Sequence, residues 1–172
     1  PTAQEFYSLI DKRLRKERAR AITQIDFTVN SPEKNAIEIK YSLKVAFINE
    51  LKGSYDPASK HYETAYENFI DLFNNGYPVT DKNWSHFRLL LDVIVFHIAR
   101  VNFYMEFPNI AFRKFDIHLK SVLYFLKNDG ILVDESKEVL SWLGSQYKWL
   151  AQLEDLAPST LVPSDYPFKF DV

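Results

Sequence analysis

The segment around residues 53–66 constrains the fold of this chain more than any other. Gly53 and the pair Asp56 and Pro57 separate two stretches in which apolar residues recur every three to four positions. Glycine favours the end of a helix because it adopts the left-handed conformation without steric cost, and proline is tolerated in the first helical turn. The pattern therefore predicts two helices that are joined by a tight turn.

The second of these helices has residues suited to close packing. Ala58, Tyr62 and Ala65 place small and aromatic side chains on one face, at the spacing that interlocks antiparallel helices. With Gly53 and Tyr55 at the elbow, the arrangement is typical of a tetratricopeptide-type hairpin. Proteins that stack such hairpins present broad surfaces to other proteins. The sequence therefore predicts a scaffold.

A second, weaker copy of the hairpin pattern starts at Ala111 and Phe115. It follows Ala58 by 53 residues, whereas regular tetratricopeptide arrays repeat at about 34 residues. The predicted fold is therefore all-α, an irregular α-solenoid of about three tetratricopeptide-like antiparallel helical hairpins.

Proline and glycine positions divide the chain into six predicted helices, and no segment predicts a strand. The first helix covers about residues 2–25, and the others start near positions 32, 56, 80, 108 and 134. The fourth is apolar on most sides and leaves Arg88 and Asp92 as a narrow polar edge, so we expect it between neighbouring helices. We expect residues 1–157 to form one helical-hairpin domain. The proline-containing residues 158–172 are expected to be extended and to lead into the rest of a longer chain.

Composition and charge exclude several classes of protein. Of the 172 residues, 47% are hydrophobic and 16% aromatic, which favours a buried core over a disordered chain. A net charge of −2 gives no basis for binding nucleic acid, and the absence of cysteine excludes disulfides and thiolate chemistry. The longest apolar run, residues 89–99, contains Asp92 and His97 and is too short and too polar to span a bilayer.

No constellation typical of catalysis or of metal binding occurs in the sequence. His61, His86, His97 and His118 lack the spacings of helical zinc and di-iron sites. His97 is expected to be a hydrogen-bonded core residue. The turn at residues 128–130 lacks the carboxylates of a calcium loop, and neither a phosphate-binding loop nor a nucleophile elbow is present. We therefore expect no catalytic residue, no cofactor, no metal and no enzyme activity.

Residues 12–20 form one strongly basic segment, with a local charge of +5. Its basic members are Lys12, Arg13, Arg15, Lys16, Arg18 and Arg20. On a helix, four of them share one side, whereas Arg15 and Arg18 project elsewhere. Three interpretations stay open: ion pairs or solvation within the domain, docking on an acidic partner surface, and weak peripheral contact with an anionic membrane.

Three tyrosines form a second candidate surface. Tyr55, Tyr62 and Tyr66 would line a peptide groove in the manner of tetratricopeptide adaptors. Aromatic residues at helical spacing more often fill a core. Both interpretations, a peptide groove and a hydrophobic core, stay open for these residues.

A set of helical positions recurs in a consistent order over most of residues 5–156. Its members are Glu5, Phe6, Tyr7, Tyr41, Lys44, Ala46, Phe47, Glu50, Leu51, Lys52, Ala58, Tyr62, Ala65, Tyr66, Ala99, Arg100, Phe103, Ala111, Phe115, His118, Trp142, Gln146 and Tyr147. This order resembles the foie gras domain of the subunit-11 type component of the transport protein particle (TRAPP) complex. The chain departs from that pattern at Ser59, where the family tends to have an aliphatic residue.

The resemblance implies a non-catalytic protein–protein interaction scaffold. It would be an assembly module of a vesicle-tethering, Rab-activating complex in ER–Golgi transport and autophagy, with other subunits of that complex as partners. The implied location is cytoplasmic, peripheral to Golgi or ER–Golgi membranes. Two alternatives stay open: an adaptor that captures a short peptide in its concave groove, and an enzyme, which would need a deep pocket with converging polar groups.

Overall fold

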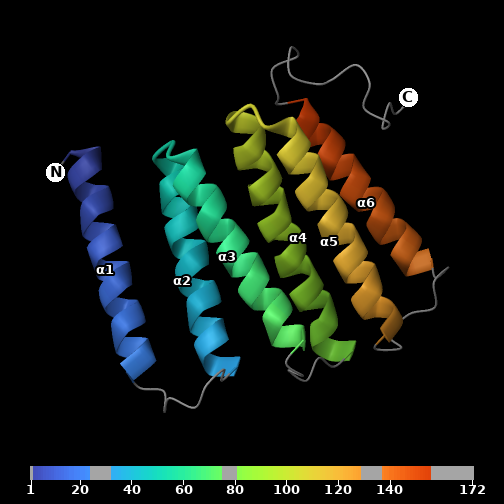
Figure 1. Ribbon diagram of the computed structural model, residues 1–172, viewed down its shortest axis with the longest axis horizontal. Coiled ribbons are helices and arrows are strands. Elements are labelled where there is room, and N and C mark those ends of the chain that lie inside the picture. The colour runs from blue at the N-terminus through green and yellow to red at the C-terminus, as the bar shows by residue number, and fades with distance from the viewer. Residues whose placement is uncertain (1, 24–31, 75–80, 129–136, 156–172) are drawn as a thin grey trace.

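The structure is a computed structural model that describes residues 2–23, 32–74, 81–128 and 137–155. These residues form six helices and contain no strand, which confirms the predicted all-α solenoid. The helices are α1 (Ala3–Thr23), α2 (Pro32–Leu51), α3 (Tyr55–Asn74), α4 (Asp81–Tyr104), α5 (Pro108–Asn128) and α6 (Lys137–Glu154). Figure 1 shows them side by side in chain order, with α1 at one end of the array and α6 at the other. The predicted proline-containing tail, residues 158–172, lies outside the described residues.

Helices α1 to α5 pack mainly against their neighbours in the sequence. The closest association joins α2 to α3, and α4 packs against both α3 and α5. The α4 helix also contacts α6, the next helix but one, so successive hairpins stack on each other. This is the nearest-neighbour packing of a solenoid.

The predicted interlock of the first hairpin is present in the core. Ala58 and Ala65 are fully buried, and Tyr62 is buried between them. Ala46 of α2 is also fully buried, so small residues on both helices let the two backbones approach closely. Ser59, the departure from the family pattern, is buried as well, and its hydroxyl accepts a 3.3 Å hydrogen bond from the amide of Asn102 on α4.

The turns after α2 and after α4 have the same backbone geometry. In the first, the N–H groups of Gly53 and Ser54 donate to the carbonyls of Glu50 and Asn49. In the second, the N–H groups of residues 106 and 107 donate to the carbonyls of residues 103 and 102. Both are Schellman motifs, which need a left-handed residue directly after the helix. Gly53 supplies it in the first turn, with φ of 72°, and Glu106 supplies it in the second, with φ of 64°.

The α4 helix is less enclosed than predicted. Leu91, Ile94, Val95, Ile98 and Ala99 are buried among the neighbouring helices. A stripe on another side of the helix is exposed, and its members are Leu89, Leu90 and Val93. The α4 helix packs against α3, α5 and α6, and its remaining side faces the solvent. Helix α4 therefore has more apolar residues than its neighbours cover.

Candidate interaction surfaces

A buried carboxylate connects the helices of the second half of the fold. The sequence predicts Asp92 at a polar edge, whereas the structure places it in the interior, 3% exposed. Its two oxygens accept hydrogen bonds from His118 Nε2 at 2.9 Å, Trp142 Nε1 at 3.0 Å and Gln146 Nε2 at 2.9 Å. A buried carboxylate is tolerated only when donors replace its water. Asp92 therefore ties α4 to α5 and α6.

The hydrogen-bonded chain continues to α3 through His118. A carboxylate only accepts, so Nε2 of His118 carries the proton that Asp92 receives as a hydrogen bond. In that tautomer Nδ1 accepts from the hydroxyl of Tyr66, 3.1 Å away. The order carboxylate, imidazole, hydroxyl is that of a catalytic triad. Here the three groups connect α4, α5 and α3 in the interior, and burial raises the pKa of the Tyr66 hydroxyl, which acts as the hydrogen-bond donor.

A second polar cluster surrounds Glu50 at the junction of α2, α3 and α4. Its carboxylate is 8% exposed and accepts a 2.8 Å hydrogen bond from the hydroxyl of Tyr62. His97 Nδ1 lies 2.9 Å from one oxygen, and Arg100 Nε donates to the other at 2.7 Å. Burial alone would raise the pKa of Glu50, but hydrogen bonds with His97 and Tyr62 and the charge of Arg100 hold it below its ordinary value. His97 is hydrogen-bonded, as predicted, and keeps part of its ring exposed.

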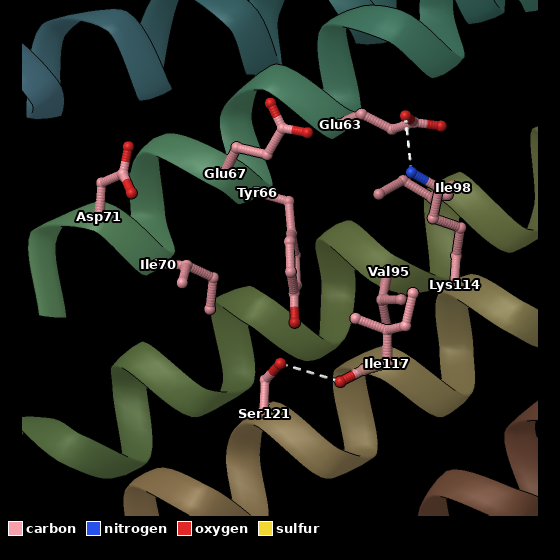
Figure 2. Close-up of a pocket in the computed structure, with 10 residues that line it drawn as sticks. All are labelled: Glu63, Tyr66, Glu67, Ile70, Asp71, Val95, Ile98, Lys114, Ile117 and Ser121. Carbon is pink, nitrogen blue, oxygen red and sulfur yellow. Dashed lines mark hydrogen bonds and ion pairs between the residues drawn. The ribbon is translucent and has the colours of Figure 1, made fainter. Parts of the chain in front are cut away.

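A hollow of about 340 Å³ lies between α3 and α5, with α4 as its floor. Its lining residues are Glu63, Tyr66, Glu67, Ile70 and Asp71 of α3, Val95 and Ile98 of α4, and Lys114, Ile117 and Ser121 of α5. Figure 2 shows the three acidic side chains in a row along α3 and the Tyr66 ring between the helices. We call this hollow the α3–α5 groove. An acidic wall over an apolar floor suits a partner that is both basic and apolar.

The opposite side of α4 carries an exposed apolar patch that extends onto α6. Leu89 and Val93, one turn apart, are 51% and 42% exposed, and Trp149 of α6 is 38% exposed. Leu89 and Trp149 line the same hollow between α4 and α6. The Trp149 ring packs edge-on against Phe96, with ring centroids 4.8 Å apart. We call Leu89, Val93 and Trp149 the α4–α6 patch.

The basic segment of α1 divides into paired and unpaired residues. Arg18 forms a two-pronged contact with Glu38 of α2, at 2.7 Å for the shortest pair of atoms, and lies over the ring of Tyr41. Arg13 and Arg15 pair within α1, with Glu17 and Asp11 respectively. Lys12, Lys16 and Arg20 are exposed and form no ion pair with any residue that the structure describes. Arg13, Arg15 and Arg18 thus have ion-pair partners within the domain, and a role in docking stays a prediction for all six basic residues.

The three predicted groove tyrosines occupy different environments. Tyr62 is a core residue that stacks on His97, so its ring is not accessible to a ligand. Tyr55 is partly buried and stacks on Tyr104 near the hairpin ends. Tyr66 alone of the three lines the α3–α5 groove. The sequence analysis did not identify the acidic residues of this groove, Glu63, Glu67 and Asp71. Their spacing of four residues, which places them on one face of α3, was the signal that could have indicated it.

Within the described ranges no group of three or more His, Cys, Asp or Glu side chains is placed to hold a metal ion. None of the helices over those ranges combines the length and the hydropathy that crossing a bilayer requires.

Comparison with known families bears on the second half of the chain. Residues 83–166 match the model of Foie gras liver health family 1. The match covers most of α4 and all of α5 and α6, which contain Asp92 with its three donors and the α4–α6 patch. It confirms the resemblance predicted from the sequence over these residues. No curated protein and no solved structure matches the chain.

Proposed function

Residues 83–166 carry a Foie gras segment, and on that premise we propose that this chain is an assembly module of a TRAPP-type trafficking complex. In this role it is a non-catalytic scaffold that contacts other subunits of a vesicle-tethering, Rab-activating complex. It would act in ER–Golgi transport and autophagy, on the cytoplasmic side of Golgi or ER–Golgi membranes. We further propose that residues 1–157 form the helical domain.

The observation that carries the proposal is the position of the α4–α6 patch within the Foie gras segment. Exposed apolar residues that lie together mark sites of protein association. Tryptophan is among the residues that contribute most binding energy to such interfaces. Trp149 packs against Phe96 in the chain alone, so its ring is already positioned for a partner. A solenoid that leaves this stripe open has a surface suited to a neighbouring subunit.

Affinity purification tests this function directly. The full-length parent protein would be tagged in cells and everything retained identified by mass spectrometry. We expect TRAPP subunits to copurify with the natural sequence and to be lost with the double substitution Leu89→Ser and Trp149→Ser. Tyr124→Ser is the control, because Tyr124 is a similarly exposed aromatic residue on α5, away from the patch. Retention of no TRAPP subunit by the natural sequence would refute the proposal.

A second candidate function is that of an adaptor that captures a short peptide in the α3–α5 groove. The specific observation in its favour is the hollow itself, with acidic side chains on one wall and an apolar floor. Binding of isolated peptides without copurification of TRAPP subunits would favour this function over assembly.

A further inference from the structure

We propose that the α3–α5 groove binds a basic amphipathic helix of a partner protein. Two basic residues of that helix, one turn apart, would contact Glu67 and Asp71, and an apolar side chain beside them would contact Ile70 and Ile117. The inference does not depend on which complex contains the chain, because it rests on the chemistry of the groove alone.

The charge of the groove is the first argument. Its lining contains three acidic residues and one basic residue, which is Lys114. Lys114 pairs with Glu63 at 2.8 Å and neutralises it. Glu67 and Asp71 are exposed and form no ion pair with any other described residue. Two acidic residues at this i, i+4 spacing repel each other on a helix, and a cationic partner would relieve that repulsion.

The spacing of the acidic residues argues for a helical partner. Glu63, Glu67 and Asp71 follow each other at intervals of four residues, so their side chains emerge one above the other along α3, about 6 Å apart. Lysine or arginine residues four positions apart on a second helix have the same separation. Because α3 and α5 run in the same direction with α4 returning between them (Figure 1), the groove is a trough parallel to their axes. A helix laid along such a trough meets both walls.

The apolar lining distinguishes an amphipathic partner from a merely cationic one. Ile117 on the α5 wall is 46% exposed, and Ile70 on the α3 wall is partly buried. Figure 2 shows both below the acidic row, on either side of the Tyr66 ring. A purely basic ligand would leave this surface in water, whereas a leucine or phenylalanine side chain would cover it.

The groove and the α4–α6 patch can be occupied at the same time. Val95 and Ile98 are the residues of α4 at the floor of the groove. Leu89 and Val93 lie on a different side of the same helix and belong to the α4–α6 patch. The two surfaces are therefore separate, and loss of one interaction leaves the other measurable.

The test is binding of fluorescently labelled model helices to the whole chain, measured by anisotropy. One probe is an 18-residue alanine-based helix with two lysines four positions apart and two leucines beside them; the other has the leucines replaced by glutamine. We expect the first to bind at least about tenfold more tightly, with affinity falling as salt rises.

Substitutions in the groove complete the test. Glu67→Gln together with Asp71→Asn is expected to weaken binding about tenfold, which corresponds to about 1.4 kcal/mol, because it removes both ion pairs with the basic residues of the probe. Ile117→Asn is expected to weaken it severalfold. The control, Glu33→Gln with Asp56→Asn, removes the same charge from exposed positions outside the groove and should leave binding unchanged.

Three results would overturn the proposal. They are equal binding of the two probes, equal weakening by the groove and control variants, and no binding of the leucine-containing probe at low salt. Circular dichroism would confirm that each variant keeps its helices. Because copurification of TRAPP subunits is measured separately, failure of the groove proposal leaves the assembly function untouched.

Discussion

At the scale of single residues, two buried carboxylates connect helices that are distant in sequence. Glu50 links α2 to α3 and α4, and Asp92 links α4 to α5, α6 and, through His118, to α3. Each has enough donors to replace its lost hydration, so these polar groups fix the mutual positions of helices whose other contacts are largely non-directional.

The pKa of Glu50 predicts how stability depends on pH. Because that pKa is lower in the folded chain than its ordinary value of 4.5, ionised Glu50 contributes stability that is fully present above about pH 4.5. The contribution is lost as the pH falls through the lowered folded-state pKa. We expect Glu50→Gln to reduce the free energy of unfolding by about 1–3 kcal/mol at pH 7. The difference from the natural sequence should shrink below pH 4.5.

Urea unfolding at a series of pH values, followed by circular dichroism, would measure this effect. Glu63→Gln is the matched control, because the Glu63 side chain is more exposed and its ion pair with Lys114 lies at the rim of the groove. That variant should change stability by less than about 1 kcal/mol. A deficit for Glu50→Gln that stays constant from pH 7 to pH 3 would contradict the assignment.

Residues of this kind mark the limit of what the sequence could predict. The donors to Asp92 lie 26, 50 and 54 positions away, and no local pattern connects them to it. Asp92 therefore looked like part of a polar edge on α4. The small and aromatic residues Ala58, Tyr62 and Ala65 were predictable, because their spacing alone places them on one face of one helix.

At the scale of the elements, the two Schellman turns differ in how well their residues suit the backbone. Gly53 adopts φ of 72° without cost, whereas Glu106 adopts φ of 64° with a side chain present. The first turn was predicted because glycine signals it. Only Pro108 indicated the second turn, because no sequence pattern marks a glutamate that adopts the left-handed backbone conformation.

Reciprocal substitutions at these turns should have opposite effects on stability. A Cβ atom added at Gly53 would meet nothing within 4 Å, so Gly53→Ala tests the backbone conformation alone and should cost about 1 kcal/mol. Glu106→Gly should raise the free energy of unfolding by about 0.5–1 kcal/mol. It removes the steric cost of a side chain in the left-handed conformation, and the greater flexibility of the unfolded chain offsets part of that gain. Thermal and urea unfolding would measure both.

Gly144→Ala is the control for the glycine substitution. Gly144 lies inside α6, and a Cβ added there also meets nothing within 4 Å. Alanine should therefore stabilise the helix by about 0.5–1 kcal/mol, the reverse of its effect at position 53. The same sign for Gly53→Ala and Gly144→Ala would show that the turn after α2 does not require a left-handed residue.

At the scale of the whole molecule, the stacked arrangement gives each helix a different share of the core. The α4 helix contributes to all three apolar clusters, and it contacts α3, α5 and α6. The α1 helix lies at one end of the array (Figure 1), packs chiefly against α2, and has Leu14 as its one buried residue. In a solenoid, such differences in neighbour contacts become differences in local stability.

We therefore expect α1 to open without unfolding the rest of the domain. Its contacts with α2 include Leu14, two ion pairs and the Arg18 side chain over the Tyr41 ring, beside a hollow of about 150 Å³, so little burial opposes its detachment. Hydrogen exchange under native conditions, resolved by mass spectrometry, should show α1 amides exchanging far faster than those of α4. Leu14→Ala should accelerate exchange in α1 alone. The equivalent truncation Ile94→Ala, at a fully buried position of α4, should lower protection from α2 to α6. If α1 and α4 exchange at the same rate, or if Leu14→Ala lowers protection throughout the chain, the array unfolds as a single cooperative unit, and nearest-neighbour packing does not govern its stability.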